Sequence, residues 1–166
     1  MKFLKNKRGS SSVEAAIILG PILILFFIFM TYFNKGMLMQ DTDYYLKEAI
    51  TSAVKQPTFD KAKQAATDSF NLGLEIGSEN EIKLRDESNP ITFEIRNLEG
   101  DLVDARTHWC KDYMLSMKVK VDRQSAFLTL NSIRDDLTGE VTRSIDNSMK
   151  LNKTIFAKIE NAKVCD

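Results

Sequence analysis

The hydrophobic positions of this 166-residue chain form one unbroken run, followed by a longer part in which apolar and polar residues are interspersed. The run comprises the nineteen uncharged residues from Ala15 to Phe33. At about 1.5 Å per residue these would make a helix of about 28 Å, close to the thickness of the hydrocarbon core of a bilayer. The pattern therefore predicts a transmembrane helix over residues 10–36.

Beyond the run, apolar residues continue at helical spacing. They recur every three, four or seven positions and comprise Leu38, Met39, Leu46, Ala49, Ile50, Ala53 and Val54. This spacing places them on one face of a helix. We therefore expect a single helix from about Ser10 to Gln56, about 70 Å long, embedded in its first half and amphipathic in its second.

Three features punctuate this helix. The hydroxyls of Ser10–Ser12 can accept hydrogen bonds from the N–H groups of a first turn, so the helix is expected to begin there. Pro21 removes a backbone donor and is predicted to kink the helix about a third of the way along the apolar run. Gly36 is a candidate hinge.

A second helix is predicted over Thr58–Asn71. Pro57 ends the long helix and suits the first turn of the next one. Gly73 and Gly77 are then expected to form a turn.

Alternating residues predict a small antiparallel sheet in the rest of the chain. Ile82–Leu84 and Ile91–Ile95, joined by the sequence DESNP, are expected to form a hairpin. Further strands are predicted over Met114–Val121 and Thr154–Ile159. The fold class is therefore α+β.

Three connecting segments are less regular. Residues 98–101 are expected to form a turn, and the segment around residues 105–112 a loop anchored by Trp109 and Cys110. The region 126–148 fits two interpretations. Its spacing is that of a strand around Phe127, Leu128 and Leu130, and that of a helix at Leu137, Val141 and Ile145.

Charge predicts the topology of the chain in a membrane. Lys plus Arg and Asp plus Glu both number 23, but the leader before the span, residues 1–9, holds four bases and no acid. The positive-inside rule then keeps the N-terminus in the cytoplasm and exports residues 37–166 to the periplasm across the inner membrane. From Asn34 onward there are 19 bases and 22 acids, so no nucleic-acid partner is expected.

Two other targeting segments fit poorly. A cleaved secretory signal has a shorter apolar region and ends at a small-residue site, whereas TYFNKG follows this run. A tail-removed lipid anchor requires an apolar C-terminus, and this chain ends in polar and charged residues.

Both cysteines, Cys110 and Cys165, lie in the part expected to be exported. An oxidising compartment favours a disulfide between them, closing a loop worth about 4 kcal/mol in the chain-entropy model. Two unrelated thiols, or a Cys165 that is free or pairs with another chain, are the alternatives.

Residues that could support catalysis or metal binding are sparse. His108 is the only histidine and is expected on a loop or the surface, because nothing around it resembles a nucleophile elbow. One histidine and two cysteines are too few for a zinc site. The acidic residues lack the pattern of a calcium loop. We therefore predict a non-enzymatic protein with no metal and no cofactor.

The entrance to the apolar run carries a recognisable motif. The residues Gly9, Ser10, Ser11, Ser12, Val13 and Glu14 stand between the basic leader and the span. They resemble the processing motif of type IV pilins. More narrowly, RGSSSVEAAIILGPILILFF resembles the start of TadE-like minor pilins, or pseudopilins, of tight-adherence (Flp-type) pili. The resemblance covers about residues 7–40.

This resemblance implies specific roles. Gly9 would precede the bond cut by a membrane prepilin peptidase, and Ser10 would become the new N-terminus, with or without a methyl group. Glu14 would pair with a terminal ammonium, its own or a neighbour's, as subunits assemble. Two charges that are each unfavourable in lipid can neutralise one another there.

The expected function is therefore that of a minor subunit in pilus assembly. Its partners would be the prepilin peptidase, other pilin or pseudopilin subunits, the assembly platform and inner-membrane lipid. Two alternatives remain open. One is an unprocessed single-pass membrane protein whose periplasmic domain binds a ligand or partner, with Glu14 among lipid headgroups. The other is a type II secretion pseudopilin.

Overall fold

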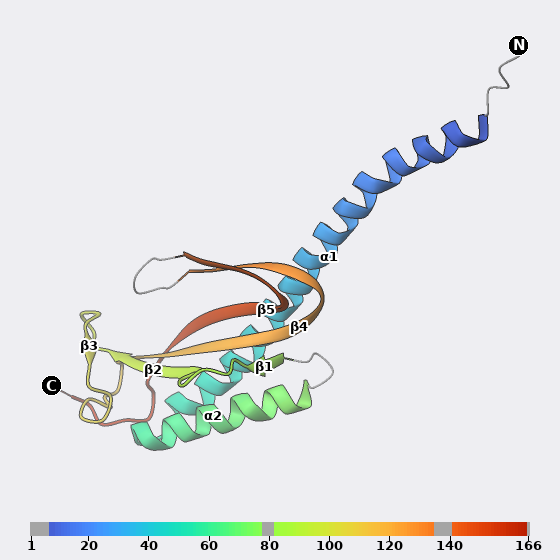
Figure 1. Cartoon of the computed structure of the whole chain (residues 1–166). Coiled ribbons are helices and arrows are strands. Elements are labelled where there is room, and N and C mark those ends of the chain that lie inside the picture. The colour runs from blue at the N-terminus through green and yellow to red at the C-terminus, as the bar shows by residue number, and fades with distance from the viewer. Residues whose placement is uncertain (1–6, 78–81, 135–140, 166) are drawn as a thin grey trace, which may run out of the picture. The chain divides into compact units, whose positions relative to one another are not determined.

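The computed structural model describes residues 7–77, 82–134 and 141–165. The chain is α+β, as predicted, and these residues form two helices and an antiparallel sheet (Figure 1). The elements are α1 (Lys7–Val54), α2 (Phe59–Ile76), β1 (Ile82–Leu84), β2 (Ile91–Arg96), β3 (Leu102–Val103), β4 (Met114–Arg134) and β5 (Val141–Lys158). The residues divide into two compact units, Met1–Met37 and Leu38–Asp166.

α1 is one helix of 48 residues that belongs to both units. Its predicted start was wrong, because the helix begins at Lys7 and the three serines lie inside it. The reason is that Lys and Arg are good helix formers, so the leader extends the helix without needing a serine cap. The chain stays helical through Pro21 and Gly36, and the kink and the hinge remain predictions.

The second unit has its core between the last part of α1, α2 and one face of the sheet. The predicted apolar stripe of α1 is buried except for Met39, which is 45 % exposed, and Leu38 and Leu46 are fully enclosed. On α2 the buried residues are Ala62, Ala66, Phe70 and Gly73. These residues of α1 and α2 form one core cluster with every second residue of β4, from Leu115 to Val121. The spacing of apolar residues in each helix and strand therefore determines which of its faces is buried.

α2 is longer than predicted and includes Gly73, which therefore does not form a turn. A Cβ atom added at Gly73 would lie 2.7 Å from Cδ1 of Tyr45 on α1. The glycine thus allows the Tyr45 ring to pack directly on the α2 backbone. Its role is close helix packing, and α2 ends at Ile76, before Gly77.

The predicted hairpin between Ile82–Leu84 and Ile91–Ile95 was wrong. Both β1 and β2 pair antiparallel with β4 along the same edge, β1 opposite residues 121–123 and β2 opposite residues 114–119. The backbone of Lys120 bridges the gap, since Arg85 donates to its carbonyl and its N–H donates to Pro90. DESNP is therefore a loop that leaves one sheet edge and returns to it, and it does not reverse the chain.

The turn predicted at 98–101 joins β2 to β3, where Ile95 pairs with Val103. The Asn97 side chain accepts hydrogen bonds from the N–H groups of Glu99 and Asp101. Gly100 has a φ of 93°, a conformation that glycine adopts without strain.

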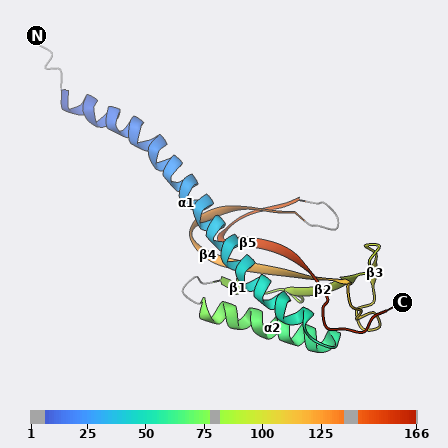
Figure 2. The same cartoon turned by 180° about the vertical axis from the view of Figure 1, so that it is seen from behind.

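The region left open between strand and helix is a strand wherever it is described. β4 continues to Arg134, and Val141 and Ile145 lie in β5; Leu137 is outside the described residues. β4 and β5 pair along most of their length, with a register shift between Gln124 and Thr129. Extra residues on one strand bend a ribbon. In Figures 1 and 2 the far part of this ribbon turns back on the side of the sheet away from α2.

The two faces of the sheet differ as the alternation in β4 predicted. Leu115, Met117, Val119 and Val121 point into the core and are fully buried. The intervening Ser116 and Lys118 lie on the opposite, outer face, together with their neighbours in β2 and β5. The last predicted strand, Thr154–Ile159, corresponds to the end of β5.

Candidate functional site

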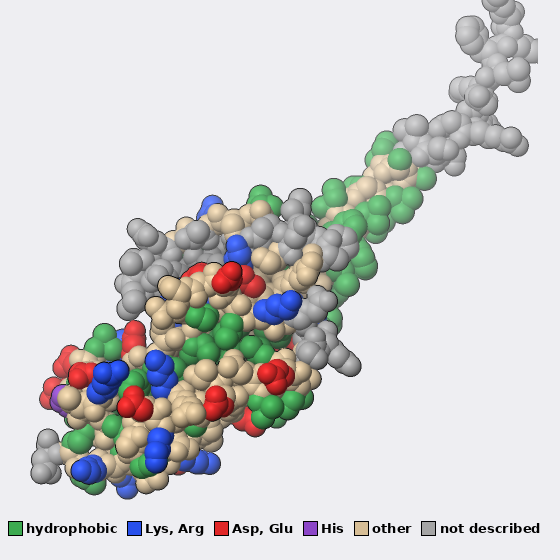
Figure 3. Space-filling model, turned by 60° about the horizontal axis from the view of Figure 1, so that its bottom comes forward, with side chains coloured by type: hydrophobic (Ala, Val, Ile, Leu, Met, Phe, Trp, Pro, Cys, Tyr) green, Lys and Arg blue, Asp and Glu red, His purple; other side chains and the backbone are tan. Residues whose placement is uncertain are grey.

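The first half of α1 exposes apolar side chains on all sides. Ile17 is 67 % exposed, Leu25 65 % and Phe33 55 %. Figure 3 shows hydrophobic side chains covering this part of the helix. A helix that is apolar around its whole circumference is suited to lipid or to packing against other helices. Among the described residues, one helix is long and apolar enough to cross a membrane, with the candidate span beginning at Glu14.

The three residues of the candidate processing motif lie in the first turns of this helix. Gly9, Ser10 and Glu14 are all helical, and the Glu14 side chain is exposed. Positions 10 and 14 are four residues apart, which places them on the same face about 6 Å apart along the axis. An ammonium formed at Ser10 by cleavage would therefore start on the same face as the Glu14 carboxylate, one turn before it.

The candidate scissile bond, between Gly9 and Ser10, is also within α1. The first turn of a helix has N–H groups without intrahelical partners and opens more easily than the interior. A glycine in this turn further weakens it, since glycine lowers helix stability by about 1 kcal/mol relative to alanine. The bond thus lies in the first turn of α1, which a peptidase can unwind while breaking few intrahelical hydrogen bonds.

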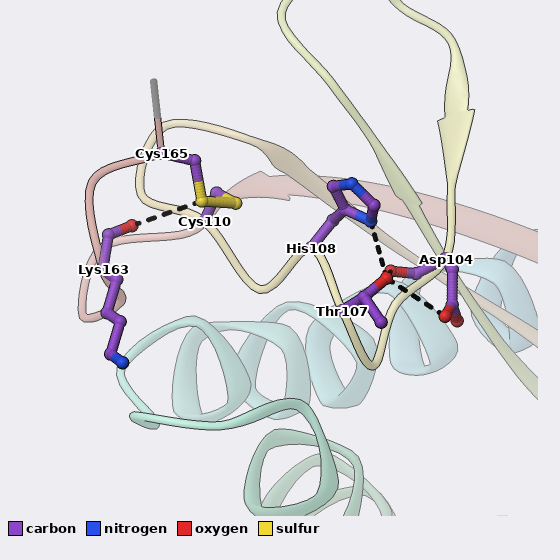
Figure 4. The surroundings of a disulfide bond; sticks show 6 residues. All are labelled: Asp104, Thr107, His108, Cys110, Lys163 and Cys165. Carbon is purple, nitrogen blue, oxygen red and sulfur yellow. Dashed lines mark hydrogen bonds between the residues drawn. A yellow bond between two sulfur atoms is a disulfide. The ribbon is translucent and has the colours of Figure 1, made fainter.

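Cys110 and Cys165 form the disulfide considered from the sequence, with their Cα atoms 5.5 Å apart (Figure 4). Cys110 is fully buried and pairs by an isolated parallel bridge with Lys163. The bond joins the loop after β3 to the tail after β5. It therefore links two segments that are far apart in sequence at one end of the second unit.

His108 lies on the same loop and is exposed, as predicted. Its Nδ1 lies 2.7 Å from the Thr107 hydroxyl oxygen, which in turn lies 3.1 Å from Oδ2 of Asp104 (Figure 4). All three side chains are solvent-accessible, so water competes for each hydrogen bond. The arrangement fits a structured surface loop, and no group of three potential metal ligands occurs in the described part of the chain.

A groove of about 380 Å³ lies on the outer face of the sheet, where the sequence offered no site. Its lining crosses three strands and consists of Thr92, Glu94, Arg96, Ser116, Lys118, Thr154 and Phe156. Two transverse rows make its floor, because Ser116 pairs with Glu94 and Phe156, and Lys118 pairs with Thr92 and Thr154. Alternation in β4 predicted the polar face, but only the strand order assembles it into a groove.

No known protein family, characterised protein or solved structure matches this chain.

Proposed function

We propose that this chain is a membrane-anchored minor pilin or pseudopilin that is processed after Gly9 and takes part in assembling a tight-adherence type IV pilus. The first half of α1 anchors it in the inner membrane, and the second unit is the periplasmic domain. Glu14 is the assembly contact, and the protein has no catalytic role.

The observation that carries this proposal is the continuity of α1. The helix that begins at Lys7 contains the exposed apolar segment and also, from Leu38 to Val54, buried residues of the domain core. Cutting after the apolar segment, as for a secretory signal, would detach the anchor and leave a new end close to Leu38. Cutting after Gly9 removes only the basic leader and leaves both functions of α1 intact. The position of the motif therefore suits a retained anchor.

Mass spectrometry of the protein isolated from its native membrane tests the processing. We expect a chain that begins at Ser10, unmodified or carrying one methyl group. Gly9→Leu should block the cut, whereas Gly20→Leu, at a position where an added Cβ meets nothing within 4 Å, should leave it unchanged. A chain that still begins at Met1 would refute the proposal.

The assembly role is tested with Glu14→Ala, compared with Glu48→Ala on the exposed side of the second half of α1. Leaving one member of a buried ion pair uncompensated costs about 3–5 kcal/mol. We therefore expect Glu14→Ala to be cleaved normally but to fall by at least about tenfold in sheared pili. Equal incorporation of both variants would argue against a pairing role for Glu14.

A second candidate function is favoured by the groove on the outer face. In this alternative the chain is an unprocessed single-pass protein whose periplasmic domain binds a ligand or partner. Hydroxyls, charged groups and the exposed ring of Phe156 meet there, which is a composition suited to polar recognition. An intact start at Met1, combined with normal membrane retention, would favour this function.

A further inference from the structure

The C-terminal end of α1 is capped by residues from two distant segments. Helix ends leave four carbonyls without intrahelical partners. Here the Val54 carbonyl accepts hydrogen bonds from the N–H groups of Glu160 and Asn161, at 3.0 and 3.2 Å. The Asn161 side chain donates to the Lys55 carbonyl at 3.0 Å. The tail after β5 therefore caps the helix that enters the core.

The loop after β3 completes this cap from the other side. The Trp109 indole donates to the Gln56 carbonyl at 3.0 Å, just beyond the end of α1. Its ring packs against Phe59 at the start of α2, with centroids 6.0 Å apart. The loop thus holds the connection between the two helices while the tail holds the end of the first.

Burial differs sharply between the two capping segments. Trp109 is 9 % exposed and Cys110 is fully buried, so the loop is fixed by packing. The tail enters the core at its first residue, Ile159, which is fully buried. Beyond Ile159 only Ala162 is partly buried against the core, while Val164 is 78 % exposed and Cys165 is exposed. A chain end with so little buried surface is expected to detach easily unless something ties it down.

The tail is tied to the loop by the disulfide and by neighbouring backbone hydrogen bonds. The N–H of Lys111 donates to the Lys163 carbonyl at 2.8 Å, beside the Cys110–Cys165 bond. Closer to β5, the N–H of Asp112 donates to the Ile159 carbonyl at 3.0 Å. Since solvent can compete for the hydrogen bonds of exposed residues, the covalent bond is the only link in the tail that does not depend on packing.

We propose that the Cys110–Cys165 disulfide is an oxidation-dependent latch that completes the cap on the C-terminal end of α1. In the reduced chain the sheet and helices are folded, but residues 160–165 are detached and the Val54 and Lys55 carbonyls face water. The latch closes by thiol–disulfide exchange with an oxidising disulfide. Two cysteine thiols lose two protons and two electrons, the S–S bond forms, and the donor disulfide is reduced to two thiols.

This proposal does not rest on the pilin function. It requires only that the chain meets an oxidant after synthesis. Its consequence is that α1 is fully capped only in an oxidising compartment, so that the domain reaches its final structure after the chain has left a reducing one.

Hydrogen exchange on the full chain in detergent micelles tests the latch. The oxidised protein is compared with the same protein in a thiol reductant and with Cys165→Ser, which leaves the buried Cys110 in place. We expect the protection of the Glu160, Asn161 and Lys111 amides from exchange to fall by at least about tenfold in the reduced protein and in Cys165→Ser. The amides of Leu115 to Val121, in the centre of β4, should change by less than about twofold.

Ala162→Ser serves as a matched control, because it perturbs the tail but keeps the disulfide. It should retain the protection of Glu160 and Asn161 in the oxidised state. Two outcomes would overturn the proposal. Unchanged protection of the tail after reduction would show that hydrogen bonds and packing hold the cap without the disulfide. A parallel loss in the tail and in β4 would show that the disulfide supports the whole domain and is not a local latch.

Discussion

The two halves of α1 share one backbone conformation but differ completely in what surrounds them. From Ile17 to Phe33 the large apolar side chains other than Met30 are exposed, whereas Leu38 and Leu46 are fully buried in the second unit. An apolar circumference needs lipid or other helices, while an apolar stripe needs only its own sheet. The length of a helix therefore says nothing of what stabilises it: the second half of α1 packs in the core of its own domain, whereas the first half has exposed apolar side chains.

The strongest test of this difference is the same substitution in each half. Leu46→Ala should reduce the free energy of unfolding of the domain by about 2.7–5.0 kcal/mol, because it leaves a cavity in a closed core. Leu25→Ala removes the same atoms from a side chain that is 65 % exposed and should leave domain stability unchanged. Urea unfolding in micelles, followed by the fluorescence of Trp109, the only tryptophan, measures both.

The two variants together test whether the first half of α1 stabilises the domain. Equal effects of Leu46→Ala and Leu25→Ala would mean that the apolar segment contributes to the domain core. Both halves of α1 would then stabilise the domain.

A second and smaller contrast uses the glycines of the two units. Gly73→Ala introduces a Cβ atom 2.7 Å from the Tyr45 ring, so the Tyr45 side chain or the backbone next to it must shift. Overpacking of this kind costs about 1–3 kcal/mol, partly offset by the better helix propensity of alanine. We expect a net loss of about 1–2 kcal/mol in the same urea experiment.

Gly20→Ala is the matched control, because an added Cβ there meets nothing within 4 Å. It should leave the unfolding of the domain unchanged. If Gly73→Ala also had no effect, the contact with Tyr45 would not be what requires a glycine at this position, and the close packing of α1 on α2 would lose its explanation.

Local patterns in the sequence predicted the elements well and their partners poorly. The stripe of α1, the alternation in β4 and the turn near Asn97 are read from neighbouring residues, and each is present. The pairing of β1 with β4 joins residues about 40 positions apart. The spacing of apolar residues predicts a strand but not which other strand it pairs with. The local pattern therefore predicts a hairpin turn at DESNP, although the chain returns to the same edge of β4.

The same limit applies to the candidate sites. Gly9, Ser10 and Glu14 are close in sequence, so their spacing could be read directly and α1 places them on adjacent turns. The groove and the cap on α1 draw residues from three or more separate segments. Neither carries a motif, and the only signal for the cap was the pair of cysteines that joins two of its segments.

The smallest expected effect concerns the charged residues on the outer face of the sheet. A hydrogen bond from Lys120 Nζ to Oε2 of Glu87, 2.6 Å long, lowers the pKa of that carboxyl below its ordinary value. A lowered pKa in the folded state stabilises the protein above the unfolded value of about 4.3, and this contribution is lost as the pH falls through the folded pKa. Because the side chain of Glu87 is 38 % exposed, the contribution should be under about 1 kcal/mol.

Glu87→Gln should therefore lower stability slightly at pH 7, and the difference from the wild type should shrink as the pH falls from 7 towards 3. Glu99→Gln, on the exposed turn between β2 and β3, serves as the control and should follow the wild type at both pH values. Urea unfolding at pH 7 and pH 3 makes the measurement. A loss in Glu87→Gln comparable to that in Leu46→Ala would show that surface ion pairs support the second unit as strongly as its core.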